Sequence, residues 1–277
     1  MTGDTFSHFP CVYSIQNRME FRLSGGEKDN VNSKGTRKAL RMKTDTVIFD
    51  LDGTLLNTLE DLADSTNYAM RAFGLKERTI DEVRQFVGNG VDMLIERAVA
   101  GELPEEQEKE CLETFKKHYS QNMNNKTRPY DGILDLVKEL LRQEYHIAIV
   151  SNKFDSAVKG LNVDYFEGLF PVAIGASDTV AKKPAPDSVM EALKELHSDT
   201  ERAIYVGDSD VDIMTARNSG LPCVSVTWGF RDEELQRSMG TDYIIHKPEE
   251  LLQVLDRRNR TCKNGLLNYC TGKDTAH

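Results

Sequence analysis

The most informative stretch of the sequence is Phe49-Asp50-Leu51-Asp52-Gly53-Thr54-Leu55-Leu56-Asn57-Thr58, which follows the apolar residues Val47 and Ile48. The apolar run predicts a buried strand, and Asp50 and Asp52 come at its carboxyl end. Ligands of open α/β sheets bind just outside the carboxyl ends of the strands. Two carboxylates there repel each other and lose hydration, so a cation or a shared proton must compensate them. The pattern indicates Mg²⁺-assisted attack of a carboxylate on phosphorus. The simpler alternative is a solvated Asp-Gly turn.

The composition is that of a globular protein with a substantial core. Hydrophobic residues make up 39% and charged residues 29% of the 277 residues. No apolar stretch approaches the length of about 20 residues that a membrane span needs. The start of the chain lacks the basic-then-apolar order of a secretory signal. The five cysteines are odd in number and form no CxxC pair, which favours free thiols in a reducing cytoplasm.

The negative charge is concentrated in the middle of the chain. The net charge is −10, yet residues 1–41 carry +3 and residues 257–277 carry +4, which leaves −17 on residues 42–256. Because phosphate contacts with nucleic acid need Lys and Arg, an acidic body argues against nucleic acid as a partner. We expect residues 1–41 to be a disordered or non-native extension, Met42 to be a plausible start, and residues 257–277 to be a flexible tail.

Strand and helix patterns alternate along the rest of the chain. Predicted strands cover residues 47–49, 147–150, 172–174, 203–206, 223–226 and 243–245, and helical patterns follow them. Buried strands flanked by helices predict an α/β fold with a doubly wound parallel sheet. Residues 58–128 show helical patterns at 79–87, 91–99 and 104–121 and no clear strand. They are predicted to form a small inserted helical cap, with the core at 42–57 and 129–256.

Polar residues follow three further predicted strands. Ser151 and Asn152 come after the second strand, where a hydroxyl and backbone N–H groups suit either a phosphate or a helix cap. Lys182 and Lys183 precede Pro184 after the third strand, and either is a candidate for an ammonium that faces a phosphate.

The fourth strand leads into a second group of acids. Asp208 and Asp212 follow it four residues apart, so they converge on one cation once a helix begins. Asp210, between them, is expected to face solvent. Acids in a first helical turn also occur simply to compensate the helix dipole.

The four motifs together resemble the haloacid dehalogenase superfamily of phosphohydrolases. They are Asp50-x-Asp52-Gly53-Thr54, Ser151, Lys183-Pro184 and Gly207-Asp208-x-x-x-Asp212, and the resemblance covers about residues 44–256. It implies a Rossmann-like core with a helical cap. Within the superfamily the chain looks most like bacterial phosphoglycolate phosphatases, on strings that include Gly88-Asn89-Gly90-Val91, Thr127-Arg128-Pro129-Tyr130 and Trp228-Gly229-Phe230-Arg231.

The resemblance implies a role for each motif. Asp50 would be the nucleophile, Asp52 the general acid and base, and Lys183 the neutralising cation. Thr54, Ser151 and Asn152 would bind the phosphoryl oxygens, and the cap loop Gly88-Asn89-Gly90 would lie over the leaving group. Mg²⁺ would be held by Asp50, the backbone carbonyl of Asp52, Asp208 and Asp212. The implied reaction hydrolyses a small phosphorylated metabolite, 2-phosphoglycolate above all, in the cytoplasm, by a monomer or homodimer.

Several other functions share these motifs. Related enzymes act on pyrophosphate, nucleotides or sugar phosphates, and a phosphomutase would return the phosphoryl group to a bound sugar. A haloalkanoate dehalogenase would use Asp50 on carbon, but Asp52 and the acids Asp208 and Asp212 favour phosphorus. A non-catalytic binding protein on the same scaffold is disfavoured because all five charged residues of the motifs are present. The cap loop is equally well explained as a plain turn. Arg97 is a candidate partner of a substrate carboxylate, but a surface role is favoured for it.

Overall fold

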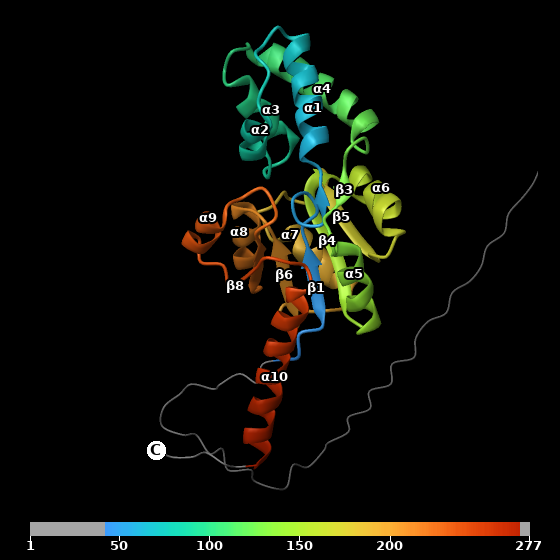
Figure 1. Ribbon diagram of the computed structural model, residues 1–277, viewed down its shortest axis with the longest axis vertical. Coiled ribbons are helices and arrows are strands. Elements are labelled where there is room, and N and C mark those ends of the chain that lie inside the picture. Colours follow the sequence, from blue (N-terminus) through green and yellow to red (C-terminus); the bar gives the residue numbers. More distant parts are fainter. Residues whose placement is uncertain (1–41, 272–277) are drawn as a thin grey trace, which may run out of the picture. The chain divides into compact units, whose positions relative to one another are not determined.

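The computed structural model describes residues 42–271, and the side chains of residues 42–260. Six parallel strands form one sheet in the order β5-β4-β1-β6-β7-β8 (Figure 1). Their bounds are β1 (Thr46–Phe49), β4 (His146–Phe154), β5 (Val172–Ala176), β6 (Ala203–Gly207), β7 (Cys223–Val226) and β8 (Tyr243–Ile245). The predicted α/β fold with a parallel sheet is therefore confirmed.

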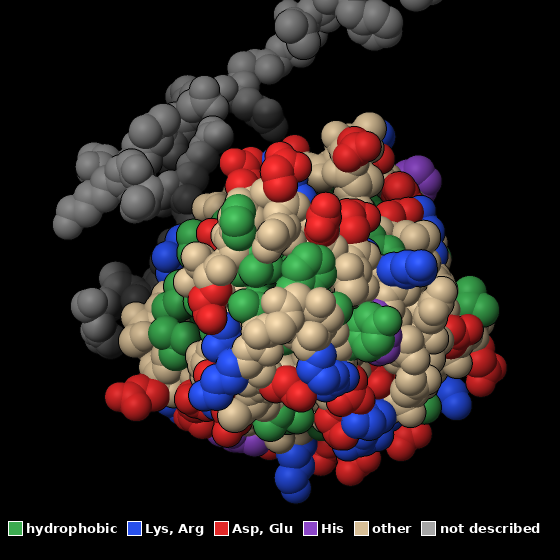
Figure 2. Space-filling view, turned by 90° about the horizontal axis from the view of Figure 1, so that it is seen from above, with side chains coloured by type: hydrophobic (Ala, Val, Ile, Leu, Met, Phe, Trp, Pro, Cys, Tyr) green, Lys and Arg blue, Asp and Glu red, His purple; other side chains and the backbone are tan. Residues whose placement is uncertain are grey.

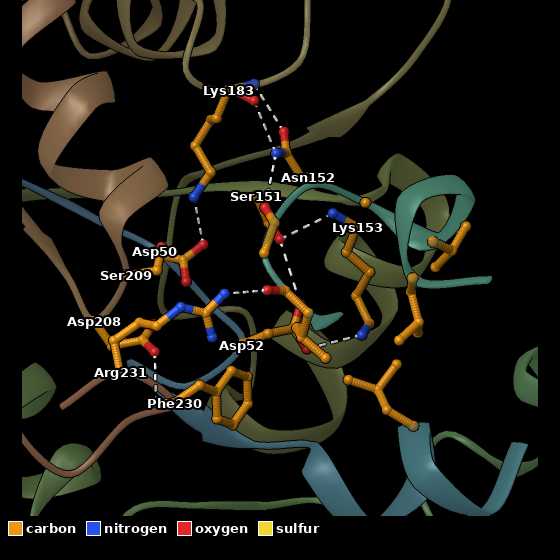
Figure 3. Close-up of a pocket in the computed structure, with 16 residues that line it drawn as sticks. Asp50, Asp52, Ser151, Asn152, Lys153, Lys183, Asp208, Ser209, Phe230 and Arg231 are labelled. Carbon is orange, nitrogen blue, oxygen red and sulfur yellow. Dashed lines mark hydrogen bonds and ion pairs between the residues drawn. The ribbon is translucent and has the colours of Figure 1, made fainter. Parts of the chain in front are cut away.

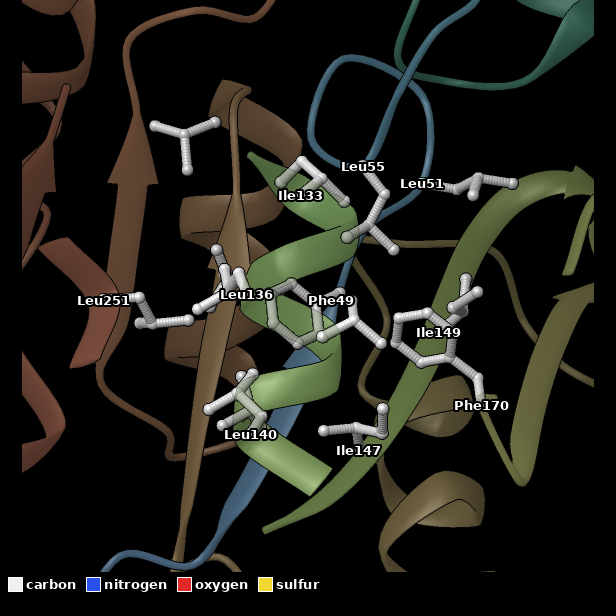
Figure 4. Packing of buried hydrophobic residues seen from close by; sticks show 14 of the residues in the cluster. Phe49, Leu51, Leu55, Ile133, Leu136, Leu140, Ile147, Ile149, Phe170 and Leu251 are labelled. Carbon is white, nitrogen blue, oxygen red and sulfur yellow. The ribbon is translucent and has the colours of Figure 1, made fainter. Parts of the chain in front are cut away.

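Helices cover both faces of this sheet. Side chains alternate across a strand, so Val47 and Phe49 face one layer and Ile48 faces the other. The first layer contains α5 (Ile133–Arg142), α6 (Asp155–Phe166) and α10 (Glu250–Thr271), and the second contains α7 (Asp187–Glu195) and α8 (Asp210–Asn218). Figure 4 shows Phe49 packed among Leu136, Leu140 and Ile149 in the first layer. The short helix α9 (Glu233–Ser238) precedes β8.

The central strand β1 aligns the polar strand ends. It pairs in parallel with β4 and β6, and Phe49 lies opposite both Ile149 and Val206. The residues that follow these three positions therefore emerge at the same edge of the sheet. This register is what brings the motifs of the sequence together.

The predicted helical cap is present between two short strands. Helices α1 (Leu59–Ala72), α2 (Ile80–Phe86), α3 (Val91–Val99) and α4 (Glu105–Asn122) lie between β2 (Leu56–Asn57) and β3 (Arg128–Pro129), which pair antiparallel. The cap has its own core, which includes Leu94, Phe115 and Tyr119. Figure 2, a view onto the cap, shows acidic and basic side chains interspersed on this face. In the part of the chain that the structure describes, no helix is long and apolar enough to cross a membrane.

The carboxyl-terminal boundary differs from the sequence prediction. Residues 257–277 were expected to form a flexible tail, but α10 continues to Thr271. Arg258 is buried and its Nε donates to the Thr44 hydroxyl (3.1 Å). Asn259 exchanges two hydrogen bonds with the backbone of Thr44, at 2.8 and 3.0 Å. These bonds tie α10 to the entrance of β1, which explains why the helix does not end at residue 256. Residues 1–41, the expected extension, lie outside the described residues.

We predict that Asn259→Ala lowers the free energy of unfolding by about 1–3 kcal/mol, because it leaves the backbone N–H and C=O of Thr44 without these partners. Chemical denaturation measures the change. Arg260→Ala is the matched control on the same helix, since Arg260 is exposed and its one ion pair among the described side chains is with Asp256 at the surface. Equal stability of the two variants would contradict the assigned role of Asn259.

Candidate active site

The predicted motifs meet at a cavity between the sheet edge and the cap. Asp50 follows β1, Asp208 follows β6, and Lys183 lies in the segment between β5 and α7. They line a cavity of about 50 Å³, together with Asp52, Ser151 and four apolar cap residues, Leu62, Val87, Val91 and Leu94 (Figure 3). The strand predicted at 147–150 is longer than expected, so Ser151 and Asn152 lie within β4 rather than in a turn before a helix.

The structure distinguishes between the two candidate lysines. Lys183 is 5% exposed, and its Nζ donates to Asp50 Oδ1 (2.6 Å), Asp212 Oδ1 (2.8 Å) and the Tyr205 hydroxyl (3.0 Å). Burial alone would lower the pKa of Lys183, but Asp212 and Asp50 outweigh it and raise that pKa, so the ammonium stays charged. Lys182 is exposed and pairs with Asp92 of the cap.

Three buried acids crowd around this ammonium. Carboxylate oxygens of Asp50, Asp208 and Asp212 lie within 4.8 Å of one another. Burial, reinforced by Asp212, raises the pKa of Asp50 well above its ordinary value and that of Asp208 to about 7. Burial would also raise the pKa of Asp212, but Lys183 and hydrogen bonds from Ser209 lower it.

These charges fit a divalent cation. The raised pKa values of Asp50 and Asp208 mean that ionising all three acids is costly while Lys183 is their only partner cation among the described residues, and a divalent cation would compensate the two charges that Lys183 does not. Carboxylate oxygens at this spacing are the donors that Mg²⁺ takes in proteins. Asp50, Asp208 and Asp212 are therefore the residues that are able to hold a metal ion.

Local sequence features fix the acids in place. Ser209 and Asp212 form a capping box at the start of α8, with Ser209 Oγ donating to Asp212 Oδ2 (2.6 Å), so that Oδ1 is left for Lys183. Gly53 has a φ of +91°, and a Cβ at this position would lie 2.6 Å from Asp208 Oδ2. Thr54 is fully buried, and its hydroxyl donates to Asp208 Oδ1 (3.2 Å).

Asp52 is held by residues that sequence reasoning did not single out. Its Oδ1 accepts hydrogen bonds from the Thr58 hydroxyl (2.7 Å) and from Lys153 Nζ (2.9 Å). The Ser151 hydroxyl lies 3.5 Å from Oδ2. Lys153 directly follows Ser151-Asn152 in the sequence, so its place after the second strand was the signal that could have revealed it.

Asn152 connects the lysine segment with the cap. Its side-chain amide exchanges two hydrogen bonds with the backbone of Lys183, at 2.8 and 3.0 Å, and donates to the carbonyl of Gly88 (3.1 Å). Gly88 and Gly90 line the cavity, as expected for the cap loop. Asn89, the middle residue of that loop, is instead bound within the cap, because its carboxamide oxygen accepts a hydrogen bond from Arg97 (2.8 Å). This bond gives Arg97 a supporting role inside the cap.

Arg231 also joins the core to the cap and was missed as a site residue. Its guanidinium donates to the carbonyls of Arg84 (2.8 Å) and Val87 (2.7 Å) at the end of α2, and its Nε donates to Asp210 (3.1 Å). Asp210 was expected to face solvent, but this ion pair half-buries it. Arg231 lies more than 140 residues after α2 in the sequence, so no local pattern reveals its contacts with that helix.

Comparison with known proteins agrees with this geometry. The model of the haloacid dehalogenase-like hydrolase family matches residues 47–226. A phosphoglycolate phosphatase of Mesorhizobium japonicum is 34% identical over 76% of this chain and 95% of its own length. The pyrophosphatase PpaX of Halalkalibacterium halodurans is 29% identical over 79% of this chain and all of its own length. A solved structure from Lactobacillus delbrueckii subsp. bulgaricus is 34% identical, covers 77% of this chain and 99% of its own, and superposes with a TM-score of 0.75.

The family match spans most of the sheet with its flanking helices and the whole cap, and the matched relatives cover about three quarters of this chain and nearly all of their own length. The chain therefore belongs to the haloacid dehalogenase-like hydrolases and is a phosphatase of that family, similar to bacterial phosphoglycolate phosphatases.

Proposed function

We propose that the protein is an Mg²⁺-dependent phosphomonoesterase that hydrolyses 2-phosphoglycolate to glycolate and phosphate through an aspartyl-phosphate at Asp50. The observation that carries this proposal is the contact of Lys183 with the Asp50 carboxylate at a cavity that also holds two further buried acids. A carboxylate attacks a phosphate only if both negative charges are balanced. The arrangement supplies a fixed cation beside the nucleophile and donors for a second one.

In the first step, an Asp50 oxygen forms a bond to phosphorus while the bond from phosphorus to the leaving oxygen breaks. Asp50, Asp208 and Asp212, with the backbone carbonyl of Asp52, would hold the metal ion. When bound, Mg²⁺ supplies charge that neutralises the phosphoryl oxygens. Lys183 holds the Asp50 carboxylate in place and adds a positive charge on the same side.

Asp52 donates a proton in the first step and accepts one in the second. Its carboxyl group gives a proton to the leaving alkoxide, which departs as an alcohol. In the second step the resulting carboxylate takes a proton from the water that attacks the aspartyl-phosphate, and this restores Asp50 and releases phosphate. The Asp52 carboxylate lines the cavity, where it is 14% exposed, so it is in a position to face the leaving group.

The remaining predicted residues bind the substrate. Ser151 lines the cavity, and we propose that it contacts the phosphoryl group together with Thr54 and the backbone N–H of Asn152. The loop Gly88-Asn89-Gly90 would cover the leaving group. A lid of this kind keeps stray nucleophiles away from the reactive acyl phosphate.

The lining of the cavity supports a small substrate. The charged sheet edge and the cap residues Leu62, Val87, Val91 and Leu94 both line the cavity, so a substrate enclosed between them is in contact with both. Curated relatives named phosphoglycolate phosphatase favour 2-phosphoglycolate. Pyrophosphate is the second candidate, because pyrophosphatase PpaX matches a similar share of the chain. We further propose that the enzyme works in the cytoplasm as a monomer or homodimer.

A panel of phosphate compounds tests the proposed reaction. With Mg²⁺ present, we expect kcat/KM for 2-phosphoglycolate to exceed that for pyrophosphate, glucose 6-phosphate and a nucleoside monophosphate by at least about tenfold, which corresponds to roughly 1.4 kcal/mol of transition-state discrimination. Released phosphate is the readout. A chelator should abolish turnover, and added Mg²⁺ should restore it.

Two results would argue against parts of this proposal. A preference for pyrophosphate would move the substrate assignment to the second candidate while leaving the chemistry intact. Full activity in the presence of a chelator would contradict the use of the acids Asp50, Asp208 and Asp212 as metal ligands.

The two neighbouring lysines form a matched pair for a second test. Lys183→Met should lower kcat by about a hundredfold or more, because it removes a preorganised charge beside the nucleophile. Lys182→Met should keep most of the activity, since Lys182 is exposed and pairs only with a cap residue. Circular dichroism would confirm that both variants are folded. Similar losses in both variants would refute the assignment of Lys183.

A further inference from the structure

Lys153 is a buried cation that none of the four motifs explains. It is 5% exposed, lines the cavity and extends from β4 of the core. Its Nζ makes two short contacts, with Asp52 Oδ1 (2.9 Å) and with the hydroxyl of Tyr119 (2.6 Å). Figure 3 shows the Lys153 side chain pointing toward Asp52 rather than toward Asp50. Lys153 therefore acts on a different acid from the one that Lys183 contacts.

Tyr119 fixes this ammonium from the cap side. It lies in α4, is fully buried and stacks on Phe115 with 5.4 Å between ring centroids. Lys153 Nζ lies 4.7 Å from the centroid of the Tyr119 ring, and the hydroxyl oxygen is the atom of Tyr119 that it contacts directly. Burial alone would lower the pKa of Lys153, but Asp52 outweighs it and the ammonium is retained.

We propose that Lys153, held by Tyr119 of the cap, is a positioning residue that prepares Asp52 for proton transfer to the leaving group. This inference rests on the proposed function, in which Asp52 is the acid of the first step. Lys153 and Thr58 both contact Oδ1, whereas Oδ2 has only the longer contact with the Ser151 hydroxyl (3.5 Å) among the described residues, so we assign the transferred proton to Oδ2. When Oδ2 transfers its proton to the departing alkoxide, the negative charge that appears on Asp52 lies beside the ammonium and is stabilised by it.

The geometry also makes this contribution depend on the cap. Asp52 and Lys153 belong to the core, whereas Tyr119 belongs to the cap. An ammonium without its cap partner has one contact fewer to fix its position. The acid is thus fully oriented only while the cap supplies Tyr119, at the stage when the leaving group is enclosed.

Leaving groups of different basicity test this role. An alkoxide such as glycolate needs a proton to depart, but p-nitrophenolate leaves without one. In rapid-quench first-turnover experiments with Mg²⁺, Lys153→Met should slow glycolate release from 2-phosphoglycolate by about a hundredfold, the usual size of a general-acid contribution. Release of p-nitrophenolate from p-nitrophenyl phosphate should slow by less than about threefold, since that step uses no acid.

Two further variants complete the experiment. Tyr119→Phe keeps the ring and its stacking on Phe115 but loses the hydroxyl, and it should slow only the alkyl ester, by about threefold to tenfold. Lys159→Met is the control, because Lys159 is exposed on α6 and, within residues 42–260, pairs with Asp155 alone. It should react with both esters as the wild type does. If Lys153→Met does not fold, Tyr119→Phe still gives the comparison between the two esters.

Equal losses with both esters would overturn the proposal, because they would mean that Lys153 only supports the fold. Unchanged rates with both esters would overturn it as well. Failure of the proposed substrate is distinguishable from either result. If the wild type prefers another alkyl phosphate, such as glycerol 3-phosphate, the comparison with p-nitrophenyl phosphate is made with that ester and tests the same role of Lys153.

Discussion

The site depends on the ammonium of Lys183 between the carboxylates of Asp50 and Asp212. All three groups are buried, and a buried charge is tolerated only when it is paired and hydrogen-bonded. Removing one partner of such a pair typically costs about 3–5 kcal/mol, because the other charge is left buried and unpaired. The ammonium balances part of the negative charge, and the remaining excess makes the place suitable for a divalent cation.

This arrangement is possible because three strands end together. The register of β1 with β4 and β6 places Asp50, Ser151 and Asp208 at one edge, and the side chain of Asn152 holds the backbone of Lys183 beside them. The same amide also reaches Gly88 of the cap. Hydrogen bonds of one side chain thus connect the cap to the charged centre. The register of β1 with β4 and β6 therefore determines both how the sheet packs and which residues meet at the site.

The sequence predicted the parts of this protein that depend on local patterns. Apolar strands followed by polar residues gave the sheet, and the helical periods at 79–121 gave the cap. Long-range contacts remained beyond its reach. No local pattern separates Lys182 from Lys183, because they differ in their distant partners. Lys182 contacts Asp92, and Lys183 contacts Asp50. For the same reason Tyr119 and Arg231 were missed, whereas Lys153 did have a local signal in its place directly after Ser151-Asn152. The continuation of α10 depends on Asn259 meeting Thr44, 215 residues away.

Trapping the covalent intermediate tests the central claim most directly. The enzyme would be mixed with 2-phosphoglycolate and Mg²⁺, quenched in acid within the first turnover, reduced with borohydride and analysed by mass spectrometry. An acyl phosphate is reduced to an alcohol, so the account predicts homoserine in place of aspartate at position 50. The aspartates at positions 52, 208 and 212 should be unmodified. In the Asp50→Asn control, these three positions should likewise be unmodified aspartate. Modification at another residue, or turnover without any acyl phosphate, would contradict the account.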